Sequence, residues 1–123
     1  MKIYESAEDY LETILMLKNR LGVVRSIDIV NELGYSKPSV SIAMKKLREN
    51  ALITVDASGH IELTDEGRSI ADGIYERHKF FTDVLTRIGV NPDVAKDDAC
   101  KLEHHLSDES FAKLKDFFTK HTF

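Results

Sequence analysis

The feature that most constrains the fold is a short break between two stretches of helical periodicity. The first stretch, residues 27–33, ends at Gly34, a residue type that commonly terminates helices. Ser36 can cap the next helix and Pro38 is tolerated in its first turn, so the second stretch runs to about Glu49. Two helices joined by so short a turn predict a helix-turn-helix.

Patterns on either side of this pair complete a mainly α fold. The other predicted elements are a helix over residues 6–20, strands over 52–55 and 61–63, a long helix over about 65–88, and two more helices that begin near Asn91 and Ser107. The loop 56–60 holds small and turn-forming residues, so the strands form a hairpin, or wing. We expect an N-terminal winged helix-turn-helix domain over residues 1–64 and an all-helical domain over residues 65–123.

Composition argues against a disulfide-bonded protein, a membrane-spanning protein and an enzyme. The single cysteine, Cys100, excludes an internal disulfide, and no apolar run approaches the roughly 20 residues of a membrane span. The chain has no glycine-rich phosphate loop and no second group of acid-base residues, so we do not expect an enzyme. These features predict a cytoplasmic binding protein.

The charge distribution indicates double-stranded DNA as a partner. The formal net charge is −4, yet the segment from Arg20 to Arg48 holds six basic and two acidic side chains, a net charge of +4 that leaves −8 for the remainder. In a helix-turn-helix, the start of the second helix enters the major groove. The predicted DNA-binding residues are Ser36, Lys37, Pro38, Ser39, Ile42 and Lys46. A solvated basic face on an ordinary helical hairpin is the alternative, and the wing that follows favours DNA.

The wing itself provides few candidate contacts with DNA. Residues 56–60 contain no lysine or arginine, so only Ser58, the backbone of Gly59 and His60 could meet a phosphate. His60 is predicted to be a polar residue at the tip of the wing.

Three residues of the helical domain are of types that bind transition metals. Cys100, Glu103 and His104 have the spacing i, i+3, i+4, which places side chains on one face of a helix. A thiolate, a carboxylate and an imidazole that converge in this way form a candidate metal site. A buried cysteine beside a glutamate and a histidine at the edge of the core is the alternative.

Two other helices carry further candidate ligands. Asp9 and Glu12 lie on the side of the first helix away from its apolar stripe, where a solvent-facing or capping role would also account for them. His78 falls within the apolar stripe of the long helix, between Ile74 and Phe81, where an imidazole needs a partner. A hydrogen-bonded core histidine and a metal ligand both satisfy that need.

The chain resembles the diphtheria-toxin-repressor and manganese-transport-regulator family of metal-dependent transcriptional regulators over nearly its whole length. The matching segments are EDYLETI (residues 8–14), SKPSVS (36–41), LTDEG (63–67), RH (77–78) and DACKLEHHLS (98–107). The last of these is the most specific. The resemblance implies a repressor that binds a palindromic operator as a homodimer, uses divalent metal as its co-repressor, and binds metal and dimerises through its helical domain.

The resemblance also implies a metal site that draws on three helices. In the manganese branch of the family, an Asp and a Glu on the first helix, a His on the long helix, and two Glu and one His on the next hold a pair of metal ions. The corresponding residues here are Asp9, Glu12, His78, Cys100, Glu103 and His104. Cys100 departs from this set, because it stands where the manganese branch has a Glu and is the residue type of the iron-responsive branch. We expect one or two ions per chain, with Fe²⁺ or Mn²⁺ favoured and Zn²⁺ or Co²⁺ compatible with the thiolate.

Other functions are compatible with the residues alone. A winged-helix regulator that senses an organic ligand or the oxidation of Cys100 would bind DNA without stoichiometric metal. A metallohydrolase would use Glu103 and His104 in turnover, and a protein-interaction module would bind no DNA with any metal.

Overall fold

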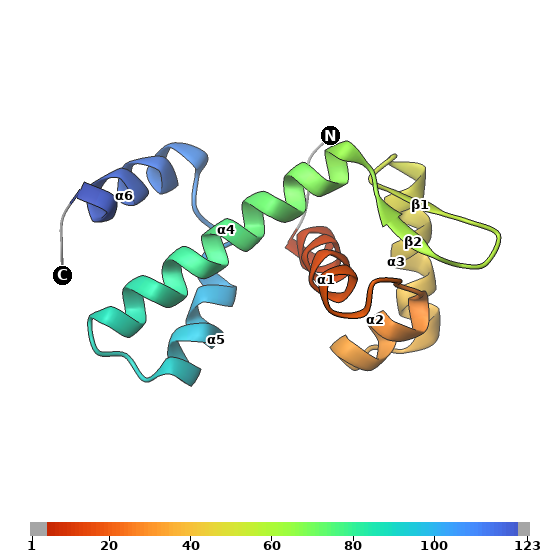
Figure 1. Cartoon of the computed structure of the whole chain (residues 1–123), viewed down its shortest axis with the longest axis horizontal. Helices are drawn as coiled ribbons and strands as arrows, with labels where there is room; N and C mark the ends of the chain where they lie inside the picture. Colours follow the sequence, from red (N-terminus) through yellow and green to blue (C-terminus); the bar gives the residue numbers. More distant parts are fainter. Residues whose placement is uncertain (1–4, 121–123) are drawn as a thin grey trace. The chain divides into compact units, whose positions relative to one another are not determined.

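The computed structural model describes residues 5–120 of the chain. Its elements are, in order, α1 (Glu5–Leu21), α2 (Ser26–Leu33), α3 (Lys37–Glu49), β1 (Ile53–Val55), β2 (Ile61–Leu63), α4 (Asp65–Arg87), α5 (Pro92–Leu102) and α6 (Asp108–Lys120), as Figure 1 shows. The predicted mainly α fold with a short hairpin is confirmed. Within the described residues, no helix is both long and apolar enough to cross a membrane.

The chain forms two compact units by its internal contacts. We call Met1–Asp72 unit 1 and Gly73–Phe123 unit 2, and the boundary between them falls within α4. The domain boundary that the sequence places after Thr64 stays a prediction.

Unit 1 contains the helix-turn-helix. α2 ends at Gly34, whose φ of 73° is left-handed and whose N–H donates to the Val30 carbonyl. The Ser36 hydroxyl accepts a hydrogen bond from the Ser39 N–H at 3.3 Å and so caps α3. Pro38 occupies the first turn of α3, as the sequence predicts.

Apolar residues from every element of unit 1 meet in one core. Besides Ala71 of α4, those with an exposed fraction of 1% or less are Leu11, Ile14, Leu17, Val24, Ile29, Val40, Leu52, Ile53 and Ile61. α1 packs against α2, α3 and β2, and α3 also packs against α2 and β1. Because each buried side chain of this size stabilises the fold by roughly 1.5–3 kcal/mol, this core holds α3 in a set orientation relative to α1 and the wing.

The wing is a short antiparallel hairpin in which Ile53 lies opposite Leu63 and Val55 lies opposite Ile61. The second strand also bonds to the connection between α1 and α2, where the Ile61 N–H donates to the Val24 carbonyl at 2.7 Å. The wing is therefore attached to the segment immediately before α2.

Thr64 joins the wing to the start of α4. Its hydroxyl donates to the Ala51 carbonyl at 2.8 Å and accepts from the Gly67 N–H at 3.1 Å, while its own N–H donates to the Leu52 carbonyl at 3.1 Å. These bonds bring the first turn of α4 so close to Leu52 that a Cβ atom on Gly67 would collide with the Leu52 carbonyl oxygen.

Unit 2 consists of the rest of α4 together with α5 and α6. The Asn91 side chain accepts a hydrogen bond from the Asp93 N–H at 2.9 Å and caps α5, with Pro92 in the first turn, as the sequence predicts. Aromatic rings join α4 to α6: Phe80 and Phe111 lie edge to face with ring centroids 5.4 Å apart. Such a pair contributes about 0.5–1.5 kcal/mol beyond the area it buries.

Gly67→Ala tests the close approach of α4 to Leu52. The added methyl group has no room, so we expect a loss of about 1–3 kcal/mol in the free energy of unfolding, measured by urea denaturation. Gly73→Ala on the same helix is the matched control, because its Cβ would meet open space and should stabilise the protein by about 0.5–1 kcal/mol. Equal effects of the two substitutions would contradict the interpretation.

Candidate metal centre and nucleic-acid interface

Cys100, Glu103 and His104 do not all lie on one helix, contrary to the sequence prediction. α5 ends at Leu102, so Cys100 lies in its last turn and Glu103 is the C-cap residue. The Glu103 N–H still donates to the Ala99 carbonyl at 3.0 Å, so Cys100 and Glu103 keep their helical relationship. His104 lies in the turn that follows.

Arg77 of α4 accounts for the end of α5. This buried side chain donates hydrogen bonds to the carbonyl oxygens of Glu103, at 3.3 Å, and of Leu106. It also donates to the Asp108 carboxylate at 2.6 Å. The guanidinium thus binds the carbonyl of the C-cap residue of α5 and one in the connection that follows, and it shapes the turn that holds Glu103 and His104.

His78, Cys100 and Glu103 come together within unit 2. One potential ligand atom from each residue lies within 4.8 Å of the other two. His78 Nδ1 lies 3.0 Å from Glu103 Oε2 and 3.7 Å from Cys100 Sγ. Glu103 is buried, His78 is half-buried and Cys100 is exposed, so this cluster is open to solvent at the thiol. The predicted partner of His78 is therefore a carboxylate.

The second carboxylate oxygen of Glu103 faces another imidazole. Glu103 Oε1 lies 3.3 Å from His104 Nε2, and both side chains are 1% exposed. A buried carboxylate between two imidazoles, with a thiol alongside, offers nitrogen, oxygen and sulfur donors to a divalent transition metal. The donor chemistry of these four residues fits such an ion.

Asp9 and Glu12, the two candidate ligands of α1, belong to unit 1. Asp9 is half-buried, and Glu12 is only 9% exposed, so the solvent-facing role considered for this pair does not apply to Glu12. Their membership of the metal site stays a prediction.

All six predicted DNA-binding residues lie at the start or along the outer face of α3 and are exposed. Ile42 has an exposed fraction of 58%, which is high for an isoleucine in a helix. The Ser36 hydroxyl donates to the Ser39 hydroxyl at 2.9 Å in addition to capping α3. Since this bond uses the Ser36 hydrogen, Ser39 keeps its own hydroxyl hydrogen for a base or phosphate acceptor.

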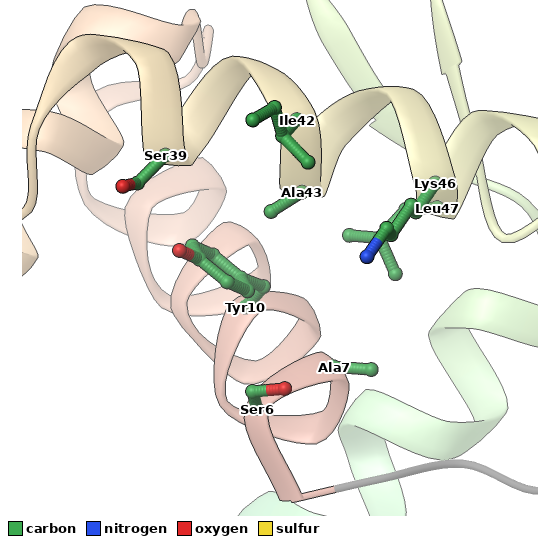
Figure 2. Close-up of a pocket in the computed structure, with 8 residues that line it drawn as sticks. All are labelled: Ser6, Ala7, Tyr10, Ser39, Ile42, Ala43, Lys46 and Leu47. Carbon is green, nitrogen blue, oxygen red and sulfur yellow. The ribbon is translucent and has the colours of Figure 1, made fainter.

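Part of this surface borders a cavity of about 290 Å³ between α3 and α1. Figure 2 shows the lining residues, Ser6, Ala7, Tyr10, Ser39, Ile42, Ala43, Lys46 and Leu47. Tyr10 lies edge-on to Tyr35 of the helix-turn-helix, with ring centroids 6.0 Å apart. Burial, together with the neighbouring Tyr35, raises the pKa of Tyr10, so its phenol stays protonated and able to donate.

Sequence reasoning missed Ser6 and Tyr10 as neighbours of the predicted DNA-binding residues of α3. Nothing in their local pattern indicates this position, because it follows from the packing of α1 against α3.

Comparison with known proteins gives two family matches that together span nearly the whole chain. Residues 2–61 match the family described as "Iron dependent repressor, N-terminal DNA binding domain". Residues 64–123 match the family described as "Iron dependent repressor, metal binding and dimerisation domain".

Similar proteins include regulators from several bacteria. The transcriptional regulator MntR of Escherichia coli O6:H1 is 35% identical over 95% of this chain and 76% of its own length. The diphtheria toxin repressor of Corynebacterium glutamicum is 32% identical over 87% of this chain and 47% of its own length.

Solved structures of the same fold include two manganese regulators. The manganese regulator SloR matches with a TM-score of 0.79 and 27% identity, over 98% of this chain and 56% of that chain. A manganese-dependent transcriptional repressor in complex with manganese matches with a TM-score of 0.80 and 29% identity, over 89% of this chain and 51% of that chain. The chain thus spans about half the length of these two solved proteins.

Cys100→Ser tests whether the thiol is a metal ligand. Titration of the wild-type protein with Co²⁺ should produce the near-ultraviolet absorption of a thiolate bound to cobalt, and the variant should lose this absorption because a serine hydroxyl is a poor ligand. His105→Ala, which removes an exposed imidazole outside the cluster, should leave the spectrum unchanged. An identical cobalt spectrum for Cys100→Ser would remove the thiol from the metal site.

Proposed function

This chain belongs to the iron-dependent repressor family, and we propose that a divalent transition metal controls its affinity for DNA by binding to the cluster of His78, Cys100, Glu103 and His104. Its N-terminal part is the DNA-binding domain of the family, and its C-terminal part is the metal-binding and dimerisation domain. It is a DNA-binding transcriptional regulator of metal homeostasis that takes divalent metal as cofactor and acts as a homodimer. We further infer that it works in the cytoplasm, by binding and not by catalysis, with a domain boundary at Thr64.

The observation that carries the metal proposal is the convergence of two imidazoles and a thiol on one buried carboxylate. His78, Cys100, Glu103 and His104 would hold the ion from unit 2. Carboxylate and imidazole donors suit Mn²⁺ and Fe²⁺, whereas the thiol also suits Zn²⁺ and Co²⁺. The two oxygens of Glu103 contact different imidazoles, which is compatible with either one or two ions per chain. Fe²⁺ or Mn²⁺ is the cofactor that we propose.

We also propose Asp9 and Glu12 as the ligands of α1, on the basis of the family resemblance. A bound cation supplies the positive charge that offsets the mutual repulsion of the ligand carboxylates. Because these two residues belong to the DNA-binding domain, ligation by them would link metal affinity to DNA affinity. Metal would then shift the protein toward the DNA-binding arrangement only to the extent that it binds this arrangement more tightly than the other.

On the DNA side, we assign α3 as the recognition helix. Ser39 and Ile42 are exposed on its outer face and suit contacts with base edges and thymine methyl groups, whereas Lys46 suits a phosphate. A two-fold dimer would place two such helices about 34 Å apart, or a multiple of that distance, and so favour a palindromic operator.

Asp9→Ala tests the metal dependence and the role of α1 together. We expect wild-type protein to bind DNA, selected from a random pool, with Mn²⁺ or Fe²⁺ and to release it on chelation, whereas the variant should lose this metal response because a ligand is missing. Fluorescence anisotropy measures DNA binding, and elemental analysis identifies the bound ion. Glu8→Ala, the neighbouring carboxylate outside the proposed set, is the control. A normal metal response in Asp9→Ala would exclude Asp9, and chelator-resistant DNA binding by the wild type would favour control by thiol oxidation or an organic ligand.

Lys46→Ala tests the phosphate contact of α3. The substitution should weaken binding about equally across DNA sequences and reduce the slope of log affinity against log salt by about one, since one phosphate contact is lost. Lys101→Ala, an exposed lysine of α5, should change neither quantity. A loss confined to particular DNA sequences would instead make Lys46 a base-reading residue.

A further inference from the structure

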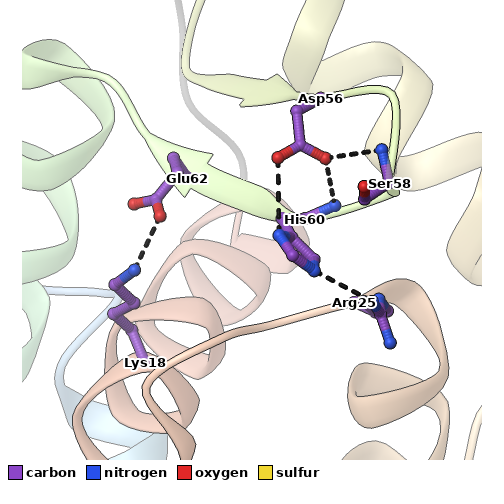
Figure 3. Close-up of polar contacts among 6 residues, drawn as sticks. All are labelled: Lys18, Arg25, Asp56, Ser58, His60 and Glu62. Atoms are coloured by element: carbon purple, nitrogen blue, oxygen red, sulfur yellow. Dashed lines mark hydrogen bonds and ion pairs between the residues drawn. The ribbon is translucent and has the colours of Figure 1, made fainter.

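The wing loop has no lysine or arginine of its own, but the structure places an arginine against it. Arg25 precedes α2, and its Nη2 lies 2.9 Å from Nε2 of His60, which is 35 positions away in the sequence. Figure 3 shows this contact together with the Asp56 carboxylate on the other side of the imidazole. His60 is thus more than the polar tip residue that the sequence predicts.

The partners of His60 indicate which ring nitrogen accepts. A guanidinium can only donate, so in this contact Nε2 is the acceptor and Nδ1 is the ring nitrogen that can donate. Nδ1 faces Asp56 Oδ2 at 3.4 Å. The imidazole is therefore oriented by Asp56 on one side and holds Arg25 on the other.

Asp56 is itself held by the backbone of the loop. Its Oδ1 accepts hydrogen bonds from the N–H groups of Ser58 and His60, both at 2.9 Å. The bond from His60, with that from Ser58, lowers the pKa of Asp56 although partial desolvation opposes them. Asp56 is accordingly ionised at neutral pH, and Asp56, His60 and Arg25 form one continuous chain of polar contacts.

Arg25 differs from Lys18 and Arg20 of α1 in what its side chain contacts. Lys18 pairs with the Glu62 carboxylate at 2.6 Å, and Arg20 pairs with the Glu32 carboxylate at 3.0 Å. Arg25 is exposed and instead donates to an imidazole, and within residues 5–120 its guanidinium makes no direct ion pair with a carboxylate. A guanidinium has five N–H donors, and one bond to His60 leaves others for a phosphate.

We propose that Arg25 supplies the wing's contact with a DNA phosphate and that His60 is the positioning residue that aims its guanidinium. The proposal rests on the proposed function, because it requires that unit 1 binds DNA. The bond from the Ile61 N–H to the Val24 carbonyl supports it, since this bond fixes the wing beside the residue that precedes Arg25. The wing then acquires the charge that its own sequence lacks.

The rival interpretation is that the same contacts merely hold the wing against α2 for stability. The two interpretations predict different salt dependences of DNA binding, because the salt slope reports the number of phosphate contacts. They do not predict different unfolding temperatures. They also differ in the response to glutamine at position 60, whose side-chain oxygen can accept from Arg25 as the imidazole does.

The experiment measures affinity for a random-sequence duplex of roughly 30 base pairs, about three helical turns, in saturating Mn²⁺ over a series of salt concentrations. We expect Arg25→Ala to reduce the salt slope by about one. His60→Ala should weaken binding, and His60→Gln should restore it. In the Arg25→Ala background, His60→Ala should have no further effect, because the two residues act through one contact. Arg20→Ala, which removes an exposed arginine paired with Glu32, is the matched control and should leave the slope unchanged.

An unchanged slope in Arg25→Ala, with only a lower unfolding temperature, would overturn the phosphate contact and leave the proposed function intact. Equal defects of His60→Ala and His60→Gln, or additive effects in the double variant, would overturn the positioning role of His60. Failure of the wild-type protein to bind DNA with any metal would overturn the proposed function and the wing contact with it.

Discussion

The buried guanidinium of Arg77 is the interaction on which the arrangement of unit 2 depends. It lies over the Phe111 ring, 5.1 Å from its centroid, and donates to two carbonyl oxygens after α5 and to the Asp108 carboxylate at the start of α6. An arginine does not lose its charge in a protein, so a buried one must find several acceptors. Here those acceptors lie on the connection between α5 and α6 and at the start of α6, so this one side chain links α4 to both.

The same interaction places the donors of the proposed metal site. Arg77 and His78 are adjacent on α4, and the carbonyl that Arg77 binds belongs to Glu103, whose carboxylate contacts His78. The backbone and the side chain of Glu103 are therefore both held from α4. A ligand set fixed in this way needs little reorganisation to accept an ion, which favours tight binding. In the proposed site, the thiol of Cys100 at the exposed edge is the donor that would make the choice of metal distinctive.

In unit 1, neutral hydrogen bonds take the place of a buried charge. The Ile61 N–H, the Val24 carbonyl and the Thr64 hydroxyl join the wing to the segment before α2 and to the start of α4. The apolar core sets the orientation of the recognition helix, and these polar bonds set the position of the wing beside it. The elements that would meet DNA are thus rigidly supported, as a surface that reads a duplex without rearrangement requires.

The sequence by itself determined the helices, the wing and the types of metal donor. Ser36 before α3 and Asn91 before α5 were identifiable because a cap involves groups only a few residues apart, and periodicity marked the buried faces for the same local reason. Only the tertiary structure decided where α5 ends, that Glu103 lies between two imidazoles, and that Arg25 meets His60 of the wing. These contacts join residues far apart in the chain, and they follow from how the helices pack around each core, which no local pattern encodes.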